Sequence, residues 1–152
     1  MDLGIKNKTA LVFGAGSGLG QAMAIALAKE GVKVALAGRN MAKLEETSQL
    51  IQAAGGKTFC IGWDLANLGI IDQNFGQVEK ELGSVDILVN NTGGPPPTTA
   101  ANQSAALWAE KFQEMVLSVI AITDRAIGGM KERGWGRIIT STSSGAITPI
   151  PN

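Results

Sequence analysis

Residues 14–20 read Gly14-Ala15-Gly16-Ser17-Gly18-Leu19-Gly20, directly after the apolar run at 10–13 and directly before an alanine-rich stretch at 21–28. A strand, a glycine turn and a helix in this order place backbone N–H groups at a helix N-terminus, where they bind phosphate. Glycine accepts a positive φ without steric cost, and it has no Cβ to hold ligand oxygens away from the main chain. A turn that merely starts a helix is the alternative, but it does not need this many glycines, each of which costs chain entropy. The stretch therefore predicts a phosphate-binding turn.

Strand and helix patterns alternate along the chain. The expected strands are 9–13, 32–37, 58–63, 86–90 and 137–142, and the expected helices are 19–30, 41–54, 68–82 and 104–133. The stretches 91–102 and 149–152 are rich in proline and predict loops. Strands separated by helices indicate parallel β-α-β units, and hence an α/β fold with a doubly wound sheet in the order 3-2-1-4-5. Ligands of such sheets bind where the order reverses, so the glycine turn and residues 90–94 are expected to meet.

Composition narrows the classes of function. The chain has 152 residues, which is the size of one domain (1–152), and its 13 basic residues balance its 13 acidic ones. No basic cluster is present, so binding to nucleic acid or to an anionic membrane is not expected. One cysteine and the lack of an apolar span favour a cytoplasmic protein. With no histidine and no tyrosine, the chain has no imidazole base, and no metal site is expected.

Several motifs resemble those of the short-chain dehydrogenase/reductase family. The spacing Gly14-x-x-x-Gly18-x-Gly20 is similar to the family's glycine turn, with Phe13 in place of the usual threonine. The segment 90–93, Asn-Asn-Thr-Gly, resembles the family's N-N-A-G motif, and the segment 136–143 resembles its fifth strand. The motif with three consecutive prolines at 95–97 is similar to that of 3-oxoacyl-carrier-protein reductases. The resemblance covers the whole chain in the right order.

The resemblance implies a Rossmann-like fold and a nicotinamide cofactor. It implies cofactor binding by Gly14, Gly16, Ser17, Gly18, Leu19, Gly20, Arg39, Asp64, Leu65, Asn91, Thr92 and Gly93. The end of the second strand bears on which cofactor is used, because NAD sites place a carboxylate there and residues 36–40 contain none. Arg39 offers a planar cation for a 2′-phosphate, so NADP is preferred over NAD. The alternative is that Arg39 is only a solvated turn residue.

The catalytic residues are where the resemblance is incomplete. It implies that Ser143 binds the carbonyl of a small-molecule substrate, although Ser141 and Ser144 are close neighbours. The family's tyrosine follows that serine by about thirteen positions, which lies beyond Asn152, and Met115 stands where its asparagine is expected. The chain is therefore expected to be the N-terminal part of a carbonyl reductase, with the C-terminal part of the family fold missing. The alternative is a non-catalytic NADP-binding module, and a methyltransferase is disfavoured because the second strand does not end in an acidic residue.

Apolar residues also predict association. Without a sixth strand and its helix, the fifth strand and the apolar side of the 104–133 helix would lack their usual cover, which predicts a homo-oligomer. The three tryptophans, Trp63, Trp108 and Trp135, are scattered along the chain and are expected to be packing residues. The three prolines at 95–97 are expected to stiffen a loop beside the nicotinamide, with a polyproline ligand for a partner as the alternative.

Overall fold

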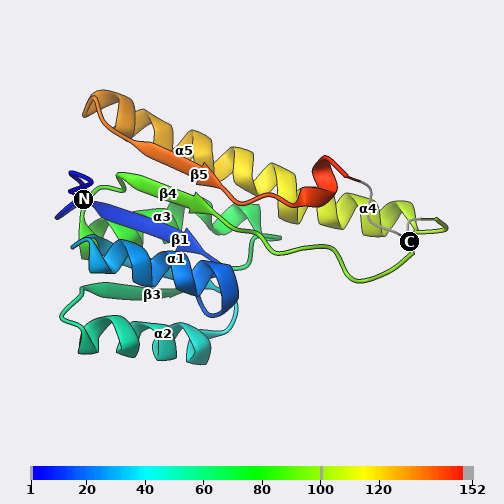
Figure 1. Cartoon of the computed structure of the whole chain (residues 1–152). Helices are drawn as coiled ribbons and strands as arrows, with labels where there is room; N and C mark the ends of the chain where they lie inside the picture. Colours follow the sequence, from blue (N-terminus) through cyan, green and yellow to red (C-terminus); the bar gives the residue numbers. More distant parts are fainter. Residues whose placement is uncertain (1, 100, 149–152) are drawn as a thin grey trace.

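Five parallel strands form one sheet in the order β3-β2-β1-β4-β5, as predicted (Figure 1). The computed structural model describes residues 2–99 and 101–148, so the loop expected at 149–152 lies outside the described residues. The strands are β1 (Thr9–Phe13), β2 (Lys33–Gly38), β3 (Thr58–Gly62), β4 (Ile87–Asn90) and β5 (Arg137–Thr140). The helices are α1 (Gly18–Lys29), α2 (Met41–Ala53), α3 (Ile71–Leu82), α4 (Ala105–Phe112) and α5 (Ser118–Glu132). Short helical turns span Leu68–Ile70 and Ser144–Ala146.

Strand β1 is the centre of the sheet. All its residues are buried, which explains why this stretch reads as an unbroken apolar run. Leu11 lies opposite Ala35 of β2 on one side and opposite Leu88 of β4 on the other. Because all these pairings are parallel, the carboxyl ends of β1, β2 and β4 lie at the same edge of the sheet.

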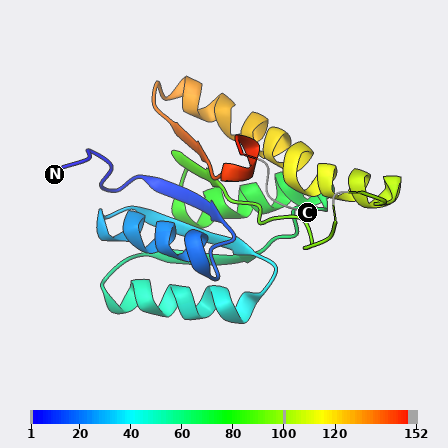
Figure 2. The ribbon, with the colours of Figure 1, turned by 45° about the vertical axis from the view of Figure 1, so that its right-hand side comes forward.

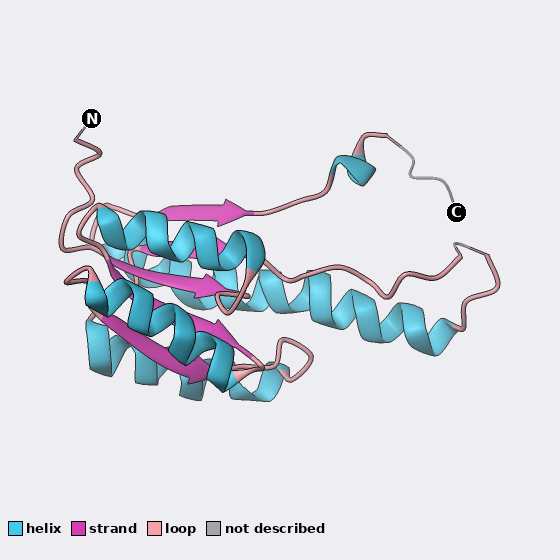
Figure 3. Cartoon of the chain, turned by 60° about the horizontal axis from the view of Figure 1, so that its bottom comes forward, coloured by secondary structure: helices cyan, strands magenta, loops and turns pink. Residues whose placement is uncertain are grey.

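Helices cover both faces of the sheet (Figures 2 and 3). One core cluster joins the sheet to α1 and α2 and includes Val12, Ala24, Leu36, Leu44 and Ile51. The other core cluster joins the sheet to α3 and α5 and includes Leu11, Phe75, Val78, Leu88, Ile122 and Met130. The long α4–α5 segment extends past the carboxyl ends of the strands, toward the side where ligands bind in folds of this type (Figure 3).

The helix expected at 104–133 is interrupted by a π-helical segment, Gln113–Leu117. This segment lies between α4 and α5 without interrupting the helical rod, so the long helix predicted at 104–133 is present and contains a π-helical segment. The Ser118 hydroxyl donates a hydrogen bond to the Glu114 carbonyl at 2.6 Å, one turn back. Such π segments change which side chains face the sheet, and they are common at functional sites.

The prediction that the tryptophans are packing residues holds for only one of them in full. Trp63 is buried and meets Phe13 edge to face, with ring centroids 4.9 Å apart. Trp135 is half-buried and stacks with Lys8, whereas Trp108 on α4 is 65% exposed. The expectation for Trp108 is wrong, because its side chain faces only a cavity that it shares with the loop at 95–99 and so remains mostly exposed.

In the part of the chain that the structure describes, every helix is too short or too polar to cross a membrane.

Candidate dinucleotide-binding site

The glycine turn approaches two neighbouring elements more closely than a side chain would allow. Gly14 has φ +63°, and a Cβ there would lie 2.6 Å from Asn91 Nδ2. A Cβ on Gly20 would lie 2.2 Å from the Gly14 carbonyl oxygen, so α1 can start this close to β1 only with glycine there. Gly18 also has a positive φ, +55°, but a Cβ there would meet nothing within 4 Å. Gly14 and Gly20 therefore let the elements pack, while Gly18 leaves the open side of the turn clear.

Hydrogen bonds from α2 hold the turn in place. The Thr47 hydroxyl donates to the Ala15 carbonyl at 3.0 Å and accepts from Gln21 Nε2 at 2.9 Å. The Ala15 N–H donates to the Ala37 carbonyl at 3.3 Å. Phe13, directly before the turn, has no hydroxyl, unlike the threonine in the motif that the turn resembles. The Thr47 hydroxyl fixes the turn from α2 instead.

The N-terminus of α1 keeps its amides available. Ser17 occupies the capping position, but its side chain makes no capping hydrogen bond, and the first turn contains no acidic residue. By contrast, the N-terminus of α2 is closed by Asn40, whose side chain accepts from the Lys43 N–H at 3.2 Å. The first amides of a helix need partners, and an uncapped N-terminus satisfies them with water or an anionic ligand.

The segment after β4 meets the glycine turn, as predicted. Asn91 Nδ2 donates to the Phe13 carbonyl at 3.3 Å and so joins the ends of β4 and β1. On the other face, Asn90 Nδ2 lies 3.4 Å from Thr123 Oγ1 of α5. These contacts fix the crevice at the point where the strand order reverses.

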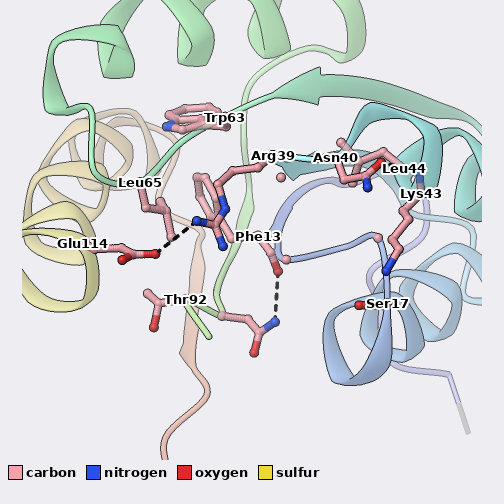
Figure 4. Close-up of a pocket in the computed structure, with 14 residues that line it drawn as sticks. Phe13, Ser17, Arg39, Asn40, Lys43, Leu44, Trp63, Leu65, Thr92 and Glu114 are labelled. Carbon is pink, nitrogen blue, oxygen red and sulfur yellow. Dashed lines mark hydrogen bonds and ion pairs between the residues drawn. The ribbon is translucent and has the colours of Figure 1, made fainter. Parts of the chain in front are cut away.

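A cavity of about 250 Å³ occupies this crevice (Figure 4). It is lined by Phe13, Gly14, Gly16, Ser17, Gly38, Arg39, Asn40, Lys43, Leu44, Trp63, Leu65, Asn91, Thr92 and Glu114. Backbone and polar groups of the glycine turn line the cavity together with the rings of Phe13 and Trp63, which contact each other. The Trp63 Nε1 is buried and has no hydrogen-bond partner among the described residues.

Two cations and one carboxylate set the charge of the cavity. Arg39 projects from the end of β2 and is 73% exposed, with its Nη1 3.9 Å from Glu114 Oε1. Lys43, in the first turn of α2, extends toward Ser17 (Figure 4). Lys111 lies 2.6 Å from Glu114 Oε2 and 2.9 Å from Glu110 Oε1, and its hydrogen bonds to these two carboxylates raise the pKa of Lys111.

The structure places more than half of the predicted cofactor-binding residues at this cavity. Those that line it are Gly14, Gly16, Ser17, Arg39, Leu65, Asn91 and Thr92. Gly18 and Leu19 are exposed at the start of α1, and Gly20 is buried beneath the turn. Their side chains, or Cβ positions, are thus outside the lining, although their amides belong to the open N-terminus of α1.

Three other predicted residues lie outside the lining. The exposed Asp64 carboxylate accepts from the Ala66 N–H at 3.1 Å in a local turn. Gly93 is exposed with φ +88°, which glycine tolerates best. Ser143 is exposed after β5, and its Oγ accepts from the Gly145 N–H at 3.0 Å.

Sequence reasoning did not assign seven of the lining residues to the site: Phe13, Gly38, Asn40, Lys43, Leu44, Trp63 and Glu114. Lys43 lies in the first turn of α2, close in sequence to Arg39, and a basic residue at this point of a predicted helix could have drawn attention to it. Asn40 is recognisable as a helix cap. Glu114 lies in the π segment and Trp63 directly after β3, and no local pattern indicates that these two segments meet at the crevice.

The glycine turn, the open start of α1 and the crevice between β1 and β4 fit a known family. Residues 8–152 match the family of short chain dehydrogenases. This chain belongs to that family. It is 35% identical to the ketoacyl reductase HetN of Nostoc sp. over 139 residues, which are 91% of this chain and 48% of the relative. It is 33% identical to a putative ketoacyl reductase of Streptomyces coelicolor, covering 91% of this chain and 54% of the relative.

Solved structures agree with this assignment. L-sorbose reductase from Gluconobacter frateurii, solved in complex with NADPH and L-sorbose, superimposes with a TM-score of 0.92 at 30% identity. The match covers 99% of this chain and 57% of that structure. The chain thus spans about half the length of the curated relatives it matches.

Proposed function

We propose that this chain binds NADP(H) in the crevice and forms the cofactor-binding part of a carbonyl reductase. The observation that carries the proposal is the pair of cations, Arg39 and Lys43, at an edge of the cavity whose strand ends without a carboxylate. A carboxylate at that point would accept from a ribose 2′-hydroxyl, whereas a guanidinium suits a 2′-phosphate. The NADPH complex of the Gluconobacter relative supports the same choice.

The chain's own residues divide the binding task. The open N-terminus of α1 binds the pyrophosphate through backbone amides, and Gly18 gives it unobstructed access. Leu65, Thr92 and the aromatic rings of the cavity border the adenosine part. Ser143, after β5, binds the substrate carbonyl in this proposal. The bound cofactor supplies hydride chemistry, in which a small-molecule carbonyl is reduced or the corresponding alcohol oxidised.

Titration with the two reduced cofactors tests this proposal. The full chain is titrated with NADPH and with NADH while the nicotinamide fluorescence is followed, and NADPH is expected to bind more tightly. Arg39→Gln is expected to weaken NADPH binding by about tenfold to a hundredfold, in line with the loss of a charge-assisted hydrogen bond, and to change NADH binding little. Equal affinity for both cofactors, unchanged in Arg39→Gln, would refute NADP selectivity. A lack of binding to either would refute the proposal as a whole.

A binding module without catalysis is the second candidate. The absence of tyrosine from the 152 residues favours it, because the proton donor used by the family is a tyrosine. Saturable NADPH binding without consumption of NADPH in the presence of carbonyl compounds supports this candidate. Turnover by the chain refutes it.

We also infer that the protein is cytoplasmic and homo-oligomeric. The single cysteine, Cys60, leaves no internal disulfide, which suits a reducing compartment. Four apolar side chains spaced by four residues form an exposed stripe along α4 and the start of α5: Trp108, Phe112, Val116 and Ile120. Exposed apolar stripes of this kind are normally buried by association. Light scattering that shows a stable monomer at micromolar concentration would contradict this inference.

A further inference from the structure

One carboxylate lies at the cavity where an anion is expected to bind. Glu114 comes from the π segment between α4 and α5, far in sequence from the glycine turn, and its side chain is only 13% exposed. It lines the same cavity as Arg39 and Lys43, and Figure 4 shows its carboxylate directed at the Arg39 guanidinium. The carboxylate would thus be a near neighbour of a 2′-phosphate bound at Arg39.

The two oxygens of Glu114 have different cationic partners. Oε2 is bonded to Lys111 at 2.6 Å, while Oε1 faces Arg39 Nη1 at 3.9 Å. Lys111 anchors the side chain on its own helix, and this leaves Oε1 free to attract Arg39. Glu110, Lys111, Glu114 and Arg39 together carry no net charge, so Arg39 is already compensated before any ligand binds.

Lys43 differs from Arg39 in this respect. Within the described residues, the ammonium group of Lys43 makes no ion pair. Its backbone N–H donates to the Asn40 side chain, which does not involve the charge. Lys43 therefore offers its full charge to a phosphate, whereas Arg39 must first leave Glu114 or be shared with it.

We propose that Glu114 is a specificity-determining residue, which competes with the 2′-phosphate of NADP(H) for Arg39 and so limits the preference for NADP(H) over NAD(H). This inference rests on the proposed function. The 2′-phosphate must displace the Glu114 carboxylate from Arg39 and also tolerate its like charge nearby. NAD(H) has a neutral hydroxyl at this position, so its binding requires no such exchange. Glu114 thus weakens binding of the phosphorylated cofactor selectively.

Glu114→Gln tests the proposal because it removes the charge and keeps the shape. Binding of NADPH, NADH, 2′,5′-ADP and 5′-AMP to the full chain is measured by isothermal titration calorimetry. We expect Glu114→Gln to tighten binding of NADPH and 2′,5′-ADP by about twofold to fivefold, the size expected for a partly exposed ion pair. Binding of NADH and 5′-AMP should change less than twofold. Glu114→Ala, which also lacks the charge, provides a second variant, and thermal melting confirms that each variant is folded.

Glu110→Gln is the matched control. It makes the same change of charge on a carboxylate that shares Lys111, but Glu110 is exposed and lies outside the cavity lining. We expect it to leave the ratio of NADPH to NADH affinity unchanged. In an Arg39→Gln background, Glu114→Gln should have a smaller selective effect, because the residue for which it competes is gone and only the repulsion between like charges remains.

The outcomes separate this inference from the proposed function. If the wild-type chain binds none of the four ligands, the proposed function fails and this inference fails with it. If the wild-type chain binds NADPH but Glu114→Gln leaves the NADPH-to-NADH ratio unchanged, or lowers it, only the role of Glu114 is overturned. A selective gain that is as large without Arg39 as with it also overturns it, because competition for Arg39 would then contribute nothing.

Discussion

Strands β4 and β5 are neighbours in the same sheet, yet they differ sharply in burial. Every residue of β4 is buried, between helices on one face and the other, whereas every residue of β5 is exposed. Ile139 of β5 pairs with Val89 of β4 but is 47% exposed. The sheet is therefore covered by helices from β1 to β4, which we call its closed side, and exposed at β5, its open side.

This contrast separates two parts of the molecule. The crevice lies mainly among β1, β2, β4, α1 and α2, whose apolar side chains form a buried cluster, although Glu114 also reaches it from the π segment. The part formed by β5 and α4 exposes apolar side chains, including Trp108 and Ile139, that a partner surface would cover. We therefore expect cofactor binding and association through the exposed apolar side chains to be separate properties, and variants can test each alone.

The largest expected effect comes from a substitution that creates a cavity in the buried strand β4. Leu88→Ala in β4 removes a fully buried side chain and should lower the free energy of unfolding by about 2 to 5 kcal/mol. The matched change Ile139→Ala in β5 should cost less than about 1 kcal/mol, because that side chain is already half in water. Urea denaturation followed by circular dichroism measures both. Equal losses would show that β5 is covered in solution and would break the comparison.

The next effect concerns the glycine turn. Gly20→Ala forces a methyl group to within 2.2 Å of the Gly14 carbonyl oxygen, so it should destabilise the chain by about 1 to 3 kcal/mol and abolish cofactor binding. Gly76→Ala in α3 is the control, since a Cβ there meets nothing within 4 Å. It should stabilise the helix by up to about 1 kcal/mol. Normal NADPH binding by Gly20→Ala would contradict the tight approach of α1 to β1.

The open side can be tested through association. Phe112→Ser removes an aromatic ring from the exposed stripe and should weaken an oligomer by about tenfold or more, as loss of a buried phenylalanine predicts. The same variant should keep its affinity for NADPH, because Phe112 does not line the cavity. Light scattering over a dilution series measures the first property and fluorescence titration the second. An oligomer that is unaffected by the change would show that this stripe is not its interface.

The smallest expected effect is at the cap of α2. Asn40→Ala removes the hydrogen bond to the Lys43 N–H and should cost about 1 kcal/mol of stability. Because the cap fixes the first turn of α2, which carries Lys43, NADPH binding should weaken slightly while NADH binding stays the same. Asn40→Asp, which preserves a capping oxygen, should retain most of the stability. A larger loss in Asn40→Asp than in Asn40→Ala would count against this role for the cap.

Local patterns predict much of this structure. The apolar run at 9–13 and the glycines at 14–20 determined β1, the turn and the start of α1, and the alternation of elements was enough for the strand order. Arg39 was also predicted, because it directly follows a strand. These features depend on residues that are close in sequence, where periodicity and turn chemistry carry the information.

Other features depend on packing between distant segments. Glu114 lies in a π segment and its carboxylate is near Arg39, and the pattern of apolar residues at 104–133 contains no sign of either feature. Trp108 is a large apolar residue of a type common in cores, but it lies on a side of α4 that the loop at 95–99 covers only in part. The surroundings of Glu114 and Trp108 depend on how segments distant in sequence pack together, and the periodicity of apolar residues does not determine that packing.

A crystal structure of the full chain grown with NADPH tests the central claim most directly. The account predicts pyrophosphate density at the N-terminus of α1, beside the backbone amides of 17–20, and the 2′-phosphate between Arg39 and Lys43. Density for NADPH elsewhere, or a crevice in which side chains occupy the pyrophosphate position at saturating NADPH, would contradict it.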